Sequence, residues 1–522
     1  MRILKQQLAI FIVISASLLF GCSRSELSSH SASATGDLSP LSSTEFNRLP
    51  ALQQYAITNN LLATFYQGVA ARHFFNLSSG TTALALRQDA SNIESVRRAV
   101  ETDLPDPAPY VARANAYTYF TDAAPSVTTK YYSTRPLVLP QAELFEFPLS
   151  RDYFHRWMAY VLMNSILFSP ALELDSVRSP AVSTIYDDLV RMMDDGKTIR
   201  DIVYAHLISG PNWERFRSPE DNTREMLEIF LNRFIDAEVP LAATTCKNWS
   251  VTYDANGISS IVRGSNANTA PQQLLGASVV SCEDFYRALV NHQDLIPTVA
   301  TVLVNQFFFN ASVETKEKLI AKIVAANPTS FDALFSIILF SRAYLLDTAR
   351  TRTAEETFFG LAHRLGWKAA ANFFENFTDV RNPESASITL LRMGQGSMLY
   401  KLGRSARVPT DTLNFSLQHK LLRESLLLNR LDSATDGNGG WVVAALLDDP
   451  EVAGLSNDDF IDYLFLSTLL RRAQPTERSA LNRVITARGY AADRVMRAML
   501  VFDYVARLPE LYSMHAGQEA RP

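Results

Sequence analysis

Apolar side chains recur three and four residues apart along most of the chain, which is the spacing of an amphipathic helix. The clearest case begins at Ser218, which can cap the free amides of a helix, and Pro219 has no amide hydrogen to lose at the first helical position. Apolar residues at spacings of one, three and four then mark one face: Met226, Leu227, Phe230 and Phe234. The pattern predicts a capped helix that packs this face against a core.

Other segments repeat this helical spacing and set the fold class. Further helices are expected over 45–71, 92–102, 150–170, 183–194 and 198–209. The stretch 110–148 instead mixes aromatic and β-branched residues with several prolines, which predicts a loop with room for one strand. The chain is therefore expected to be a mostly α, multi-helical protein.

The second half of the chain contains a candidate repeat of a helical pair. Residues 301–345 align without gaps on 462–506 at an offset of 161, and this alignment places Asp332 on Asp493. Duplication of a helical unit would produce such matches. Shared amphipathic periodicity in unrelated helices would also produce them, so both interpretations stay open.

A polar segment rich in Asn, Ser, Thr and Gly interrupts the helical pattern between Cys246 and Cys282. Its order NWSVTY, DANG, ISSIV predicts a strand, a turn at Asn256 and Gly257, and a second strand. If Cys22 carries a lipid, the other two cysteines form an even pair, and in an oxidising compartment we expect them to close this hairpin with a disulfide. Such a bond would stabilise the fold by about 3 to 4 kcal/mol. Two free buried thiols are the alternative.

The amino-terminal segment has the pattern of a lipoprotein signal peptide. Arg2 and Lys5 precede the apolar run 8–20, which is too short to span a bilayer, and the run ends in LLFGC. Cys22 would then receive the lipid, whereas an ordinary signal peptide or an amino-terminal helical anchor is the alternative. Residues 23–44 are rich in serine and poor in apolar side chains, which predicts a flexible tether.

These features give an expected order of segments along the chain. They are a signal peptide (1–21), the lipidated cysteine and tether (22–44), an N-terminal helical and loop region (45–149), a helical core (150–405) with the hairpin insertion (237–284), and a C-terminal helical region (406–522). Ser23 follows the cysteine, as is typical of lipoproteins sorted to the outer membrane, so the protein is expected to face the periplasm or the cell surface. A net charge of -5 without a basic cluster argues against a nucleic-acid partner.

The order of several motifs resembles domain-of-unknown-function family 1800. NTREMLEIFL is followed by NWSV, QLLG, NHQDLIPTVATVLVNQFF, FDALFSIILFSRAYL and FFGLAHRLG, within residues 151–367. The resemblance implies a bacterial, exported, largely helical protein with no established activity. Where that family has a histidine-rich helix, residues 160–166 read YVLMNSI, and where it has His-Asp, residues 268–272 read NTAPQ. If the family holds a metal there, we expect this chain to have lost the site.

A second resemblance covers part of the C-terminal region. The stretch LSNDDFIDYLFLSTLLRRAQPTE, within residues 455–508, is similar to domain-of-unknown-function family 4214, a module of secreted proteins. The glycine and tryptophan that this family has after the proline are absent.

No motif in the sequence specifies a reaction. The chain lacks CxxCH, HxH and HExxH, so neither covalent haem nor a short metal-ligand pair is expected, and we expect no cofactor. His206 and His363 lie among apolar residues on expected helices, which is typical of structural histidines. Asp432 and Asp436 lie in a glycine-rich stretch without the bidentate acid of a calcium loop, which favours a polar turn.

Glu225 and Glu228 form a carboxylate pair on the capped helix. Two carboxylates in different environments can divide the roles of acid and base, so these residues are the weak catalytic candidates. Their place near a helix start, with Arg224 and Arg233 close in sequence, favours a structural role instead.

We therefore expect a lipid-anchored, extracytoplasmic binding or assembly component of the bacterial envelope. Its expected partners are the membrane, through the lipid, and an exported protein encoded nearby. The alternative is an envelope hydrolase or oxidoreductase that uses an acidic pocket near Glu225.

Overall fold

The computed structural model describes residues 36–69, 71–76, 85–86, 92–116, 135–163, 165–167, 179–216, 218–255, 257–366, 446–447 and 449–515. Within these ranges the protein is mostly α-helical, and its strands form two-stranded antiparallel sheets, so the expected mostly α fold is confirmed. No helix in these ranges is long and apolar enough to cross a membrane. The signal segment, Cys22, Asp432, Asp436 and the boundary expected at 405/406 lie outside the described residues.

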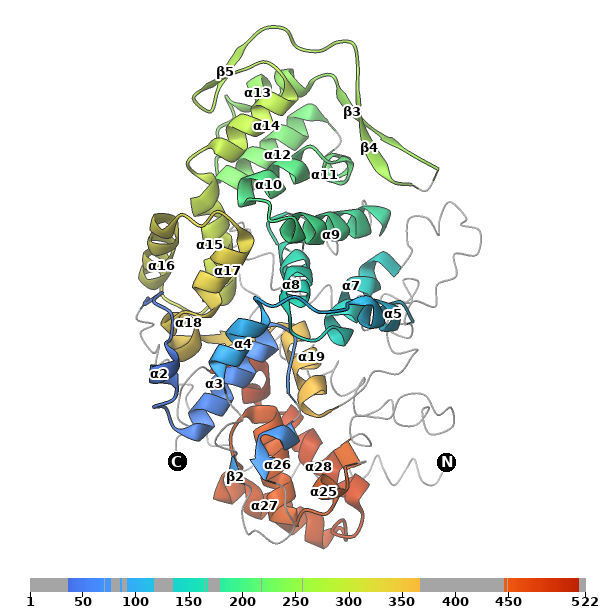
Figure 1. Cartoon of the computed structure of the whole chain (residues 1–522), viewed down its shortest axis with the longest axis vertical. Helices are drawn as coiled ribbons and strands as arrows, with labels where there is room; N and C mark the ends of the chain where they lie inside the picture. Colours follow the sequence, from blue (N-terminus) through green and yellow to red (C-terminus); the bar gives the residue numbers. More distant parts are fainter. Residues whose placement is uncertain are drawn as a thin grey trace.

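The molecule is elongated, and its helices lie at three levels along the long axis (Figure 1). One end contains α10 (Ile199–Leu207), α11 (Gly210–Arg215), α12 (Pro219–Leu231), α13 (Val239–Cys246), α14 (Cys282–Asn291), β3 (Trp249–Tyr253), β4 (Ser259–Arg263), β5 (Gln272–Leu274) and β6 (Ala277–Val279). The middle contains α2 (Ser43–Phe46), α3 (Ala51–Thr64), α4 (Ile93–Ala99), α5 (Ala108–Ala116), α7 (Arg135–Glu146), α8 (Arg151–Met163), α9 (Ser179–Asp194), α15 (Leu295–Phe307), α16 (Val313–Ala326), α17 (Phe331–Leu339), α18 (Arg342–Asp347) and α19 (Ala354–Arg364). The other end contains α25 (Pro450–Ala453), α26 (Asn457–Leu469), α27 (Pro475–Ala487) and α28 (Arg494–Ala506).

Polar caps start several helices where the sequence predicted them. The side chains of Ser150, Thr198 and Ser218 each accept a hydrogen bond from the backbone N–H three residues further on, at 3.0 to 3.1 Å. Each cap satisfies an amide that has no partner within its helix. The starts of α8, α10 and α12 were therefore correctly predicted, whereas α8 ends at Met163, before the expected end at 170.

The packed part of the chain begins before the residue predicted for it. Leu41 is only 1% exposed, and its N–H donates to the Phe340 carbonyl at 3.1 Å. On the same segment, the Ser39 carbonyl accepts from the Arg342 N–H at 2.9 Å. The prediction of a flexible tether as far as residue 44 is therefore wrong over 36–44. A single buried leucine and backbone pairing outweigh the serine-rich composition there.

The proline-rich stretch 110–148, expected to be a loop, lies largely in two helices where the structure describes it. Pro109 and Pro136 lie in the first turns of α5 and α7, where a missing amide hydrogen costs little. Pro140 stands inside α7, and the helix persists through the next turn, where Leu144 is fully buried. Tertiary burial outweighs a helix-breaking residue at this position.

The helices of the candidate repeat keep the same spacing in both segments. Shifted by 161 residues, α15, α16 and α17 would begin at 456, 474 and 492, and α26, α27 and α28 begin within two residues of these positions. Matched spacing is what a duplicated unit requires. A common origin of the two segments stays a prediction, because helix order and length alone do not demonstrate it.

The carboxyl-terminal helices are joined to the middle of the molecule by direct pairing. The strand β7 (Ala349–Thr351) pairs antiparallel with β8 (Ser513–His515), which follows the short helix η3 (Pro509–Tyr512). The Tyr55 hydroxyl of α3 donates to the Leu466 carbonyl of α26 at 2.9 Å. A smaller pair, β1 (Phe75–Asn76) and β2 (Ala85–Leu86), follows the short helix η1 (Ala71–His73).

Candidate functional site

The helix α12 carries the two candidate glutamates and ends one turn before the last residue expected on its buried face. Asn232 ends the helix in a left-handed backbone conformation, with φ at 52°. Three residues of the predicted face are buried: Met226, Leu227 and Phe230. Phe234 is 65% exposed, so the prediction that it packs against the core is wrong. The left-handed residue takes the chain out of helical register before Phe234.

Glu225 and Glu228 are half-buried on α12. The arginines expected to be their partners contact other carboxylates: Arg224 lies 2.6 Å from Asp236, and Arg233 lies 2.9 Å from Glu238. No group of three His, Cys, Asp or Glu side chains in the described part of the chain could hold a metal ion. None of these contacts favours the alternative of a hydrolase or oxidoreductase.

Cys246 and Cys282 form the disulfide expected from the sequence. Cys246 ends α13 and Cys282 begins α14, both side chains are buried, and the two sulfur atoms lie 1.93 Å apart. The bond closes the segment between them, which folds as two hairpins, β3–β4 and β5–β6. The first hairpin was predicted. The second was not, since its two-residue turn has Leu275 at a φ of 55° before Gly276 at 74°, and leucine is unusual in that conformation.

The base of the β3–β4 hairpin packs against the helices α11 and α14. Trp249 is buried, with its ring 5.2 Å from that of Trp213 on α11 and 6.0 Å from that of Tyr286 on α14. Arg263 lies over the Trp249 ring and forms an ion pair with Glu283 at 2.6 Å. The base therefore has packing and charge contacts to two helices.

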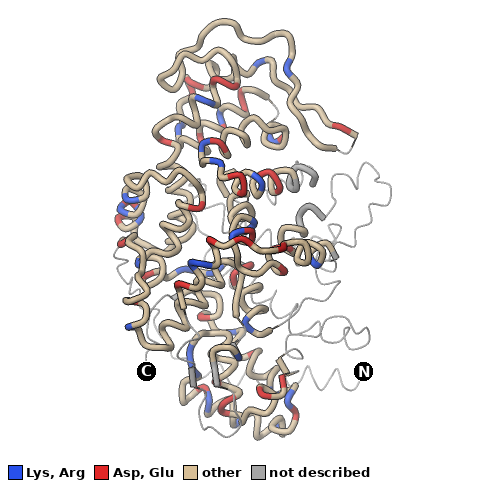
Figure 2. Tube along the Cα trace, viewed as in Figure 1, with Lys and Arg blue, Asp and Glu red and all other residues tan. Residues whose placement is uncertain are grey.

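The large apolar side chains that stay exposed in the described part of the chain concentrate in one stretch of sequence, which includes this hairpin and the residues before it. Six of eight lie between residues 234 and 262: Phe234, Ile235, Leu241, Tyr253, Ile258 and Val262. Residues 247–281 include only three charged residues, Lys247, Asp254 and Arg263, and Figure 2 shows how sparse charges are along these strands and loops. Exposed apolar side chains with few charges are typical of the centre of a protein interface.

A buried histidine that the sequence did not single out joins three helices. His155 of α8 is 3% exposed, and its Nδ1 lies 2.5 Å from Asp194 at the end of α9 while its Nε2 lies 2.8 Å from Asp332 in α17. Burial lowers the pKa of His155, but the hydrogen bonds to Asp194 and Asp332 outweigh it and raise the pKa to about 9. With both ring nitrogens bonded to carboxylates, this imidazole has a structural role and no free nitrogen for acid–base chemistry.

A second buried charge cluster lies between the middle and the carboxyl-terminal end. Arg350 contacts Glu356 through two hydrogen bonds, and its Nη2 donates to the Tyr344 hydroxyl at 3.0 Å. Nearby, the fully buried Arg364 donates to the carbonyls of Gly360 at 3.1 Å and Thr468 at 3.3 Å. These contacts connect β7, α18, α19 and α26, so the cluster stabilises the junction of these elements.

The histidines that the sequence did single out have structural surroundings. His206 is 4% exposed, and burial together with the nearby charge of Arg215 lowers its pKa to about 3. Burial lowers the pKa of His363 to about 4, and its ring stacks on Phe145 at 4.8 Å. Both imidazoles are neutral at ordinary pH, as is usual for buried histidines without an acidic partner.

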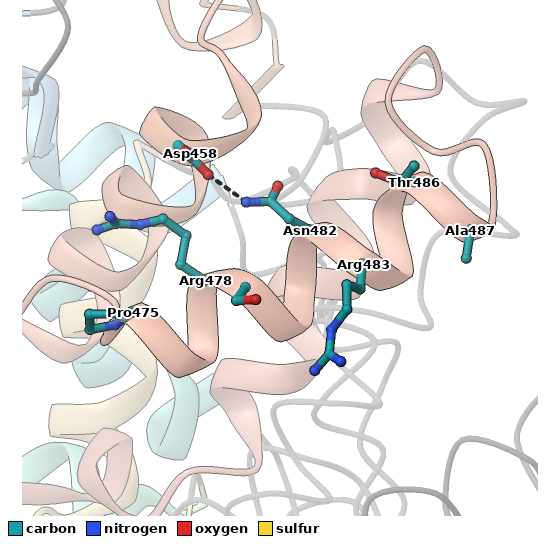
Figure 3. A pocket seen from close by; sticks show the side chains of 8 residues that line it. Asp458, Pro475, Arg478, Asn482, Arg483, Thr486 and Ala487 are labelled. Carbon is teal, nitrogen blue, oxygen red and sulfur yellow. Dashed lines mark hydrogen bonds between the residues drawn. The ribbon is translucent and has the colours of Figure 1, made fainter.

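A shallow polar groove of about 640 Å³ runs along α27 beside the start of α26 (Figure 3). Across it, Asn482 donates to Asp458 at 2.5 Å. Arg478 reaches Asp462 at 2.7 Å, while Ser479 and Arg483 line the groove. The groove is open along one helix face and does not enclose a ligand as binding pockets usually do, so we assign no ligand to it.

No protein-family model, curated protein or solved structure matches the chain. The resemblances to families 1800 and 4214 therefore stay predictions. The fold places this chain among mostly helical proteins with a disulfide-closed insertion, and the insertion is its best-defined candidate for a binding surface.

Proposed function

We propose that the protein is a lipid-anchored, extracytoplasmic binding or assembly component of the bacterial envelope, and that the disulfide-closed insertion is its docking surface. The observation that carries this proposal is the β3–β4 hairpin, which is held firmly at its base and exposes apolar side chains at and near its tip. Side chains of this kind lose unfavourable contact with water when a partner covers them.

The disulfide supports export from the cytoplasm. Bonds of this kind form and persist in oxidising compartments such as the periplasm. The pattern of the amino-terminal segment agrees with this compartment, and Cys22 would then provide the attachment to the outer membrane. A lipid at this residue would hold the insertion near other envelope proteins, among which an exported protein encoded nearby is a candidate partner.

Labelling with radioactive palmitate in a Gram-negative host tests the anchor. The wild type should incorporate the label, and Cys22→Ala should lose it and accumulate at the mass of the unprocessed chain. A Cys246→Ser and Cys282→Ser double variant is the matched control, because it changes cysteines without touching the signal and should still be labelled. Normal labelling of Cys22→Ala would refute lipidation at this residue.

A further inference from the structure

The first residues that the structure describes lie against α16. The Nζ of Lys322 on this helix donates to the Gly36 carbonyl at 2.5 Å, and a Cβ at Gly36 would lie 3.8 Å from the Cβ of Lys318. The next residue is held as well, since the Ala343 N–H donates to the Asp37 carbonyl at 2.8 Å. The chain that precedes Gly36 therefore joins the folded part of the molecule beside α16.

This junction is close in sequence to the proposed lipid. Only thirteen residues separate Cys22 from Gly36. An extended chain covers at most about 3.6 Å per residue, so a lipid on Cys22 would hold Gly36 within about 50 Å of the bilayer. A short tether raises the effective concentration of the bilayer at the surface beside its attachment point, so a contact there needs little affinity of its own.

The surface beside Gly36 includes an apolar tip at the turn between α15 and α16. Val313, the first residue of α16, is 72% exposed, which is the largest exposed fraction among the large apolar side chains of the described residues. Phe309 in the same turn is half-buried, and the Nζ of Lys316 lies 5.6 Å from the centre of its ring. Val313 precedes Lys318 by five residues, a rise of about 8 Å along the helix. Apolar side chains flanked by lysines are typical of segments that lie in the boundary region of a bilayer.

The charges of α16 are compatible with a lipid surface. Three of the ten lysines in the chain lie on this helix: Lys316, Lys318 and Lys322. Two acids on the same helix, Glu314 and Glu317, leave an excess of one positive charge, and Lys318 pairs with Glu314 at 2.6 Å. A small positive excess attracts anionic headgroups weakly, so the contact depends on the tether as well.

We propose that the turn between α15 and α16 docks on the bilayer, with Val313 at the boundary between headgroups and acyl chains and the lysines of α16 at the phosphate groups. The inference deepens the proposed function and rests on its lipid anchor at Cys22. Figure 1 shows α16 at the left of the middle level, whereas β3 and β4 lie at the upper right. A bilayer at α16 would therefore leave the β3–β4 hairpin open to a partner.

Fluorescence of the full, lipidated chain on vesicles of phosphatidylethanolamine and phosphatidylglycerol tests the contact. With Cys22 lipidated and Cys246 bonded to Cys282, an introduced cysteine is the only free thiol and can carry a polarity-sensitive dye. The dye on Val313→Cys should emit at shorter wavelength and be quenched by a nitroxide on the acyl chains. Val262→Cys is the matched control, because it replaces an exposed valine of the insertion, and its dye should show neither change.

A second variant tests whether the apolar side chain makes the contact. The dye on Ala321→Cys, an exposed position beside the lysines of α16, should be quenched by a nitroxide on the lipid headgroups. Adding Val313→Asp should remove most of this quenching, because a carboxylate is unfavourable among acyl chains, whereas Val313→Leu should keep it. Aspartate is favoured in the first turn of a helix, so α16 should stay folded, which circular dichroism and a thermal melt check.

Three outcomes would overturn the proposal while the anchor stands, each in a palmitate-labelled chain bound to vesicles. The first is equal quenching at Val313→Cys and Val262→Cys, and the second is stronger quenching at Val262→Cys, which would place the insertion at the bilayer instead. The third is quenching at Ala321→Cys that Val313→Asp leaves unchanged. Absence of the palmitate label would refute the anchor, and the docking with it.

Discussion

At the scale of single residues, the structure places ionisable groups inside the protein with partners far away in the sequence. His155 is bonded to Asp194 and to Asp332, which lie 39 and 177 residues further along the chain. The protonated imidazole satisfies both carboxylates, whereas a neutral ring can donate to only one of them. The charge of His155 therefore contributes to holding α8, α9 and α17 together.

This arrangement predicts a loss of stability at alkaline pH. Because the folded pKa of His155, about 9, lies above its unfolded value of 6.5, the contribution is fully present below about pH 6.5 and is lost as the pH rises through about 9. We expect it to be about 1 to 2 kcal/mol, since both carboxylates are partly exposed and water screens them. Urea unfolding at about pH 6 and pH 9.5 should show this decline in the wild type and a smaller one in His155→Gln. Equal declines in both proteins would refute it.

The pair of Arg350 and Glu356 should be far more sensitive to substitution. Their side chains are 3% and 4% exposed, so Glu356→Gln leaves a buried guanidinium without its carboxylate, which typically costs about 3 to 5 kcal/mol. Glu314→Gln is the control, because Glu314 pairs with Lys318 at the surface, where water screens the pair, and its loss should change stability far less. Urea unfolding measures both, and adding Arg350→Met to Glu356→Gln should recover part of the loss. Equal effects of the two glutamate substitutions would contradict the prediction.

At the scale of elements, the packing of the β3–β4 hairpin against α11 depends on a glycine. A Cβ at Gly210 would meet backbone atoms of Ser259 and Ser260 at 2.3 to 2.8 Å, and backbone cannot rotate away as a side chain can. We expect Gly210→Ala to displace the hairpin and to cost about 1 to 3 kcal/mol. The fluorescence of Trp213 and Trp249 should change with it, because their rings are 5.2 Å apart across this contact.

Gly196→Ala provides the comparison for that experiment. Gly196 has a φ of 67°, and a Cβ added to it would have no atom within 4 Å, so alanine there should add only backbone strain of about 1 kcal/mol. Tryptophan fluorescence should be unchanged in that variant. A fluorescence change of equal size in both variants would show that the effect of Gly210→Ala is not local to the hairpin.

Elements with a local sequence signal were predictable, and those that depend on distant contacts were not. Caps such as Ser218 satisfy amides a few residues away, so α12 could be located from the sequence. The turn at Leu275, the helix through Pro140 and the packing of Leu41 each depend on neighbours that are brought close only by the fold. Local propensity is a weak prior wherever tertiary burial is large.

In the candidate site, too, the features with a local signal in the sequence were predictable and those that depend on distant contacts were not. The cysteine count and the strand, turn, strand order predicted the disulfide and the first hairpin. The exposure of Phe234 could not be predicted, because it follows from where α12 ends. The two acids bonded to His155 gave no signal either, since nothing in the sequence links positions so far apart.

At the scale of the whole molecule, its two ends have different connections to the middle. The carboxyl-terminal helices are joined by the β7–β8 pair and by polar contacts from α3 and α19, so we expect them to unfold together with the middle. The insertion is closed by its own disulfide and mounted mainly on α11 and α14. The proposed docking at the insertion would therefore need no rearrangement of the central helices.

The choice between a binding component and an enzyme can be tested at Glu225 and Glu228. Both are half-buried on α12, and a structural role predicts that Glu225→Gln or Glu228→Gln lowers the melting temperature slightly, at a cost of about 1 kcal/mol or less. Palmitate labelling should be unchanged, because α12 does not contribute to the signal. A catalytic carboxylate would behave in the opposite way, since loss of its charge abolishes turnover while the fold is kept. An unchanged melting temperature, together with complete loss of a hydrolytic or redox turnover measured in the wild type, would establish the enzyme instead.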